Sequence, residues 1–229
     1  GVSFHGVELD SKEATKARKK FSGLAEKGCL GTGVTRAEFF EFISRKRGRT
    51  LKGGLDLVIG NPPYIRYQYF EKGRELAEER LEYLGIRTTR HANSWLHFLA
   101  ECVSLMSEDS RIGMVIPGEL LHVTYSSDLR RWLTEQLTSI TVVTFEKLVF
   151  PGVQQEVVVF LGEKSSRSKK NTVRLVQLED SSELSIAAVE GVSQRASRVI
   201  GDRDKWTCYF LDKQELGFYT EIEKSSGAR

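Results

Sequence analysis

Short apolar runs alternate with longer stretches whose apolar residues recur at helical spacing, and this alternation is the main pattern along the chain. The short runs predict β-strands at residues 2–9, 55–60, 111–117, 140–145 and 156–161. The longer stretches predict helices from Ser11 onward, with Ser11 as N-cap, and at residues 71–84, 91–107 and 127–137. This order favours an α/β fold with a mostly parallel sheet, closed by an antiparallel hairpin of the last two strands.

Two segments fit this pattern poorly. Residues 28–54 are interpreted as irregular, with AEFFEFI as their one apolar cluster. After residue 163 the composition becomes rich in serine and lysine, which is typical of a linker. We therefore predict a first domain at residues 1–163, and a linker with the start of another region at residues 164–229.

Composition and charge narrow the class of protein. With 40% hydrophobic and 28% charged residues, the chain has the composition of a soluble globular protein, and no apolar run is long enough to cross a bilayer. Cys29, Cys102 and Cys208 match no metal-binding spacing, so we expect reduced thiols and a cytoplasmic location. The net charge is only +3, and the basic runs at residues 45–49 and 164–170 indicate a polyanionic partner only beside a site that needs one.

The stretch DLVIGNPPYIRY, residues 56–67, is the strongest candidate for chemistry. Its prolines directly follow a predicted buried strand, which must end there because proline cannot donate to a sheet ladder. Ligands of α/β sheets bind beyond the carboxyl ends of strands, where this chain has Asn61, Pro62, Pro63 and Tyr64. The Asn61 side-chain carbonyl and the Pro62 backbone carbonyl offer two acceptors that suit a planar amine. Tyr64 adds a flat face on which a base can stack.

NPPY after an apolar strand resembles the signature of the adenine-N6 DNA methyltransferases that use S-adenosylmethionine, and the motif order resembles that of their gamma class. GVELD, residues 6–10, is similar to the second motif of this family. The resemblance implies that Glu8 accepts hydrogen bonds from the cofactor ribose and that Leu9 packs on the cofactor adenine.

Two further segments extend the resemblance. AEFFEF, residues 37–42, resembles the next motif, which implies that Glu38 meets the cofactor adenine amine and that Phe39 packs on the ring. The family usually has aspartate where this chain has Glu38. Alignment back from RIGMVIP implies that Phe98 closes the adenine pocket, and LVFPGVQQEVVVFL resembles a late motif in which Phe150 holds the target base.

The resemblance covers about residues 6–163 and implies a Rossmann-like methyltransferase fold. It implies methyl transfer from S-adenosylmethionine to the N6 amine of a flipped-out adenine, in a restriction–modification system of the bifunctional type. The corner of Asn61, Pro62, Pro63 and Tyr64 would be catalytic, and no metal is implied. Expected partners are double-stranded DNA with a specific adenine-containing site and a restriction or specificity subunit or domain, with no membrane. Residues 164–229 would begin a target-recognition region.

One motif of the family is absent, and two alternatives stay open. The Gly-containing first motif should precede GVELD, where five residues remain, and GCLGTG at residues 28–33 stands in the wrong order. We therefore expect a sheet whose first strand is missing and a chain that by itself does not bind the cofactor normally. The first alternative is transfer to a protein glutamine amide, as in the release-factor methyltransferases that also carry NPPY, or to an RNA base. The second is a non-catalytic DNA-binding fragment.

Overall fold

The computed structural model describes residues 3–25, 31–45, 51–52, 54–89, 92–150, 155–167, 171–191, 206–207, 218, 221 and 225. The strands are β1 (Ser3–Glu8), β2 (Gly31–Arg36), β3 (Leu55–Gly60), β4 (Met106–Pro117), β5 (Ser139–Phe145), β6 (Val157–Glu163) and β7 (Thr172–Leu178). The helices are α1 (Ser11–Ala25), α2 (Phe39–Ser44), α4 (Arg74–Tyr83), α5 (Ser94–Ser104), α6 (Ser127–Gln136) and α7 (Ile186–Gly191). Short 3-10 turns lie at Tyr67–Tyr69, Gly118–Leu121, Thr124–Ser126 and Ser181–Glu183.

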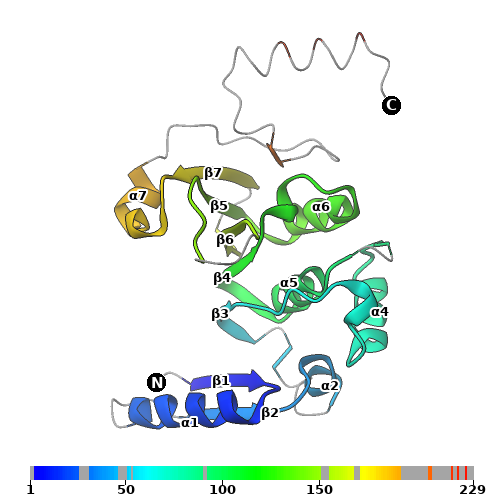
Figure 1. Cartoon of the computed structure of the whole chain (residues 1–229), viewed down its shortest axis with the longest axis vertical. Coiled ribbons are helices and arrows are strands. Elements are labelled where there is room, and N and C mark those ends of the chain that lie inside the picture. The colour runs from blue at the N-terminus through cyan, green and yellow to red at the C-terminus, as the bar shows by residue number, and fades with distance from the viewer. Residues whose placement is uncertain are drawn as a thin grey trace.

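Five strands form the main sheet, in the order β3-β4-β6-β5-β7 (Figure 1). β3 pairs with β4 in parallel, and β5 pairs with β7 in parallel, whereas β6 runs antiparallel to both of its neighbours. The predicted α/β fold with a mostly parallel sheet and a β5–β6 hairpin is therefore confirmed. The reversed strand, however, lies in the middle of the sheet and not at its edge.

The main core forms where α5 packs on this sheet. Trp95, Leu96 and Leu99 are fully buried, and they belong to one apolar cluster with Ile116 of β4 and Phe160 of β6. Full burial of one such side chain contributes about 1.5–3 kcal/mol. The stripe of apolar residues predicted on residues 91–107 thus holds α5 against the sheet, although the helix itself is shorter and β4 begins earlier, at Met106.

The sheet continues past the boundary predicted at residue 163. β7 extends it by pairing with β5 from Ser139↔Thr172 to Phe145↔Leu178. Trp206 is also fully buried in the main apolar cluster. The segment after β6 therefore contributes to the same sheet and the same core.

A second, two-stranded sheet pairs β1 with β2 in parallel, and α1 lies along it (Figure 1). The interpretation of residues 28–54 as irregular is wrong here, since both β2 and α2 lie in this segment. β2 has the sequence GTGVTR, whose single apolar residue gives no strand pattern. Its Val34 lies opposite Gly6 of β1, and a Cβ on Gly6 would be 3.3 Å from the Val34 side chain. The pairing with β1 therefore forms β2 where its own sequence does not indicate a strand.

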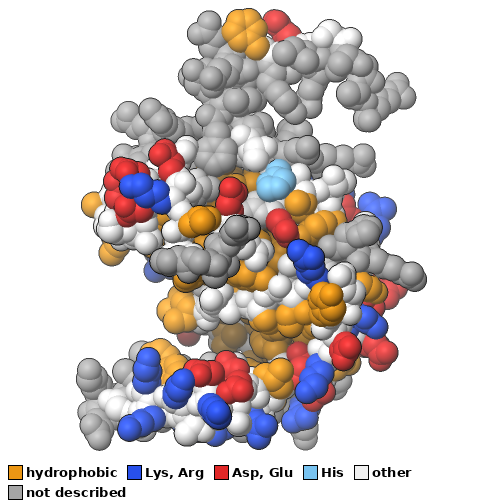
Figure 2. Space-filling view, viewed as in Figure 1, with side chains coloured by type: hydrophobic (Ala, Val, Ile, Leu, Met, Phe, Trp, Pro, Cys, Tyr) orange, Lys and Arg blue, Asp and Glu red, His pale blue; other side chains and the backbone are white. Residues whose placement is uncertain are grey.

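β1 and β3 each have one edge that pairs with no other described strand. β3 is an edge strand among the described residues, and its Leu57 and Ile59 are 59% and 75% exposed. The prediction of a buried strand at residues 55–60 is thus wrong for these two side chains, which the described residues leave largely uncovered. Figure 2 shows hydrophobic side chains between the lower body that holds α1 and the larger part above it.

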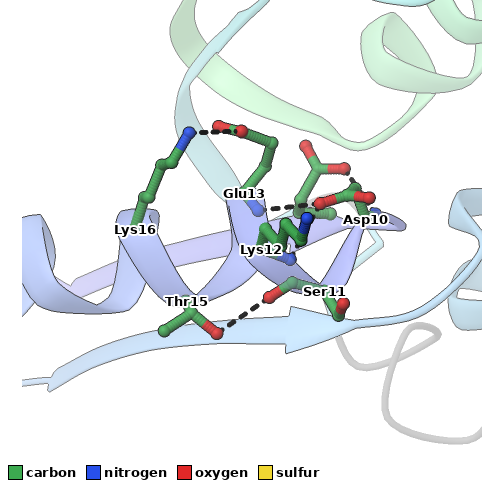
Figure 3. A network of polar contacts seen from close by, with 7 residues as sticks. Asp10, Ser11, Lys12, Glu13, Thr15 and Lys16 are labelled. Carbon is green, nitrogen blue, oxygen red and sulfur yellow. Dashed lines mark hydrogen bonds and ion pairs between the residues drawn. The ribbon is translucent and has the colours of Figure 1, made fainter.

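The N-cap of α1 is Asp10, and the prediction of Ser11 is wrong by one residue. The Asp10 carboxylate accepts the N–H groups of Lys12 at 2.8 Å and Glu13 at 2.9 Å (Figure 3). Bonds from the Glu13 and Lys12 backbone N–H groups lower the pKa of Asp10. A carboxylate at this end of the helix also interacts favourably with the positive end of the helix dipole. In Figure 2, Lys and Arg side chains are frequent on the surface of the lower part of the molecule, where α1 lies.

The structure describes some of the other features that the sequence singled out and leaves others outside the described residues. None of the helices that the structure describes is both long and apolar enough to cross a membrane. Cys102 is a free, buried thiol, and burial raises its pKa to about 12. The other two cysteines, Cys29 and Cys208, lie outside the described residues, as do residues 46–50 and 168–170 of the basic runs.

Candidate active site

The NPPY corner follows β3 directly, at the carboxyl edge of the main sheet. β3 ends at Gly60, which pairs with Met114 of β4, so Asn61 leaves the sheet beside the carboxyl half of β4. Asn61 and Pro63 are exposed, Pro62 is buried and Tyr64 is half-buried. The corner therefore presents Asn61 to solvent while its backbone stays against the protein.

The Tyr64 hydroxyl lies 2.8 Å from Asn61 Oδ1 and 2.8 Å from the Val115 carbonyl oxygen. Burial raises the pKa of Tyr64 to about 12, so the hydroxyl keeps its proton at neutral pH. One hydroxyl proton cannot serve two acceptors at once. Oxygen and nitrogen of an asparagine amide are assigned from the hydrogen bonds around them. Both contacts are satisfied if Asn61 donates its amide N–H to Tyr64 and Tyr64 donates to Val115, which leaves the Asn61 carbonyl oxygen free.

A second group of predicted residues meets at the end of β1. The Glu8 carbonyl accepts the Ala37 N–H at 3.2 Å, which joins the end of β1 to the start of α2. One Glu8 carboxylate oxygen accepts the Asp10 N–H at 2.8 Å, and the other has no hydrogen bond to the described residues. Leu9 is 50% exposed. A free carboxylate oxygen beside an exposed apolar side chain could accept from a ribose hydroxyl next to an apolar ring.

Glu38 is the N-cap of α2. Its carboxylate accepts the Glu41 N–H at 2.8 Å, and the residue is 8% exposed. Burial raises the pKa of Glu38, while bonds from the Glu41 and Phe40 N–H groups oppose that rise. Gly73, the N-cap of α4, has φ +75° and stands so close that a Cβ on it would be 2.4 Å from this carboxylate. Glu38 thus joins α2 to the start of α4.

Phe39 and Phe98, which are distant in sequence, lie with their ring centroids 5.0 Å apart and their planes at 31°. Phe40 packs edge-on to both rings, at 5.1 Å from Phe39 and 4.8 Å from Phe98. The structure therefore brings together two of the side chains that the sequence assigns to the cofactor adenine. Their role in a pocket remains a prediction.

Phe150 follows β5 and is 39% exposed. β5 runs parallel to β3 within the main sheet, so Phe150 leaves the sheet at the same edge as the corner. No ring contact among the described residues includes Phe150, and residues 151–154 beside it lie outside them. The predicted contact with a target base remains untested.

Sequence reasoning missed Ser94 and Glu119. Ser94 hydrogen-bonds to the NPPY loop, and Glu119 accepts from both Trp95 Nε1, at 3.4 Å, and the Tyr125 hydroxyl. Burial, reinforced by the Glu119 carboxylate, raises the pKa of Tyr125. No local signal marks Ser94 or Glu119, because their partners lie far away in the sequence or on another element.

His97 of α5 is a buried histidine. It is 2% exposed, neither of its ring nitrogens has a hydrogen-bond partner among the described residues, and burial lowers its pKa to about 4. His97 is therefore a neutral core residue at physiological pH. Across the described part of the chain, no group of histidine, cysteine or acidic residues is arranged to hold a metal ion.

The mostly parallel sheet with its reversed strand, and the corner at its carboxyl edge, define an α/β protein of the S-adenosylmethionine-dependent methyltransferase fold. Comparison with protein families is consistent with this class. The chain belongs to the Eco57I restriction-modification methylase family, whose sequence profile matches residues 9–150.

Individual proteins similar to this chain are of the same kind. The chain is 32% identical over 103 residues to the Type II methyltransferase M.XamI of Xanthomonas campestris pv. amaranthicola, a match that covers 43% of the chain and 19% of that protein. A DrdV–DNA complex is similar with a TM-score of 0.63 and 14% identity, over 92% of the chain and 25% of the other. A Listeria monocytogenes protein described as a class I S-adenosylmethionine-dependent methyltransferase has a TM-score of 0.53 and 16% identity, over 84% and 54%. The chain spans about a fifth of the length of the curated relatives it matches.

Proposed function

We propose that this chain forms the catalytic part of a site-specific DNA methyltransferase in a restriction–modification system. The reaction is transfer of a methyl group from S-adenosylmethionine to the N6 amine of a flipped-out adenine. The observation that carries the proposal is the corner itself. Asn61 is exposed at the carboxyl edge of the sheet, and the Pro62 carbonyl accepts no hydrogen bond from the described residues.

In this proposal the corner acts by orienting the amine. The Asn61 side-chain carbonyl and the Pro62 carbonyl accept the two amine hydrogens, which draws the nitrogen out of conjugation with the ring and frees its lone pair. Positioning of this kind accelerates a displacement without a nucleophilic side chain. S-adenosylmethionine supplies the electrophilic methyl group. Glu8 would hold the ribose of the cofactor, and Leu9, Phe39, Phe98 and Glu38 would bind its adenine.

The aromatic residues hold the target base. Extrusion of an adenine from duplex DNA costs a few kcal/mol. Stacking on Tyr64 and contact with Phe150 return about 1–3 kcal/mol for a stacked base. DNA is therefore the proposed partner, and a restriction or specificity subunit or domain accompanies the chain in the whole protein. A strand between the unpaired edges of β1 and β3 would join the two sheets.

The test is methyl transfer by the full-length protein that contains this chain. Purified protein is incubated with methyl-labelled S-adenosylmethionine and mixed-sequence duplex DNA, and the DNA is digested to nucleosides. We expect label in N6-methyladenine. Label in cytosine, in RNA or on a protein glutamine, with none in adenine, would overturn the proposal and favour the corresponding alternative.

Replacement of Tyr64 by phenylalanine tests the hydroxyl separately from the ring. Y64F keeps the stacking surface but removes the contacts with Asn61 and Val115. We expect the single-turnover methylation rate to fall about 3- to 10-fold, since a hydrogen bond is worth about 0.5–1.5 kcal/mol and 1.4 kcal/mol is tenfold.

The control for that change lies in the same loop. Tyr69 is 69% exposed, and its hydroxyl makes no hydrogen bond to the described residues, so Y69F should leave the rate unchanged. An equal loss in Y69F and Y64F would contradict the proposed orientation of Asn61 by Tyr64.

A further inference from the structure

Ser94 is the first residue of α5 and is fully buried directly beneath the corner. It makes three hydrogen bonds to the NPPY loop. Its hydroxyl donates to the Pro63 carbonyl at 2.6 Å and accepts the Ile65 N–H at 2.9 Å. Its backbone N–H donates to the Ile65 carbonyl at 2.9 Å. The Ser94 hydroxyl therefore both donates to and accepts from the loop. Its two partners, Pro63 and Ile65, are the residues on either side of Tyr64.

The loop depends on such contacts because of its sequence. Pro62 and Pro63 carry no N–H, so they cannot be held by donation to a neighbouring strand. The bonds on Pro63 and Ile65 fix the chain on both sides of Tyr64, and the Tyr64 hydroxyl reaches back to Asn61 and Val115. Within the described residues, the Pro62 carbonyl is left without a partner while the carbonyl after it is engaged.

We propose that Ser94 is a positioning residue for methyl transfer. It holds Pro63 and Ile65 so that the Pro62 carbonyl and the Tyr64 ring keep the geometry that the target amine requires. This inference rests on the proposed function and adds to it a residue outside the NPPY motif. A displacement of about 1 Å at a reacting group can cost about 100-fold in rate, so a clamp on the backbone affects the rate more than it affects binding.

The test is S94A in the full-length protein, compared with S110A. Ser110 is equally buried, and its hydroxyl donates to the Ser107 carbonyl at the opposite end of β4 from the corner. Three quantities are measured for each variant: the thermal midpoint, the dissociation constants for S-adenosylmethionine and duplex DNA, and the single-turnover rate of adenine methylation.

We expect S94A to lose about 10- to 100-fold in rate while both dissociation constants stay within about twofold of wild type. S110A should keep its rate even where its thermal midpoint falls as far as that of S94A. A wild-type rate in S94A, or equal rate losses in the two variants at equal thermal midpoints, overturns the positioning role. Loss of binding in parallel with rate overturns it as well. Absence of adenine methylation in the wild-type protein overturns the proposed function instead, so the two failures are distinguishable.

Discussion

Replacement of Asn61 by alanine is expected to lower the methylation rate of the full-length protein by at least about 100-fold, the loss typical of one preorganised hydrogen-bonding group in an active site. The change removes the side-chain acceptor from the corner and leaves the Pro62 carbonyl as the remaining one. Asn61 is exposed and follows the last residue of β3, so the change leaves the apolar core intact. The measurement is the single-turnover rate at saturating cofactor and DNA, with the thermal midpoint alongside.

Two variants make this result specific. Asn61→Asp retains carboxylate oxygens that can accept an amine hydrogen, so we expect a smaller loss than with alanine. Gln68→Ala removes an exposed amide from the same loop and should keep the wild-type rate. If Asn61→Ala also keeps that rate, the corner merely terminates β3 and the proposed mechanism fails.

Replacement of Trp95 by alanine is expected to destabilise the chain by about 3–5 kcal/mol, the range for loss of a large buried aromatic side chain. Trp95 is fully buried in the main apolar cluster, and its Nε1 donates to Glu119 at 3.4 Å. It also follows Ser94, so its loss removes the packing that seats the start of α5 under the corner. The free energy of unfolding of a domain is only about 5–15 kcal/mol, so this one substitution would remove a large part of it.

Urea unfolding of the 229-residue chain measures the effect. Trp95→Phe is the graded control, since it keeps an aromatic ring but loses the bond to Glu119, and it should cost less than Trp95→Ala. A midpoint for Trp95→Ala equal to that of wild type would mean that α5 is held mainly by other contacts.

Local sequence predicted those elements whose signal lies within one segment. The apolar runs of β4 and β5 and the helical spacing of α5 and α6 are such signals. NPPY is another, because its four residues are consecutive and predict a site without any long-range contact. β2 has no such signal, because it forms through pairing with β1 and through the space that Gly6 leaves for Val34. The sequence likewise gave no sign that Leu57 and Ile59 would be exposed, since exposure depends on what covers them.

The candidate site divides in the same way. Residues within a motif could be named from the sequence, whereas residues that support the motif from another element could not. Ser94 lies inside the helix predicted at residues 91–107 and belongs to no motif, and only the fold brings it to Pro63 and Ile65. The motif predicts a role for Glu38 at the cofactor adenine, but its close approach to Gly73 depends on the packing of α2 against the start of α4.

The central position of β6 decides where this protein can be divided. The family match ends at residue 150, yet β6 begins at Val157 and is the neighbour that β4 and β5 share. A fragment cut at the end of the match would lose the middle of its sheet, with two strands exposing apolar, unpaired edges of the kind that aggregate. During synthesis β4 also has an unpaired edge at first. Its partner residues in β6 lie about 50 positions downstream, as in the pair Ile112↔Gly162, and must be synthesised before they can cover it. Expression fragments that retain the corner and all five strands of the main sheet must therefore extend at least through Leu178, the end of β7.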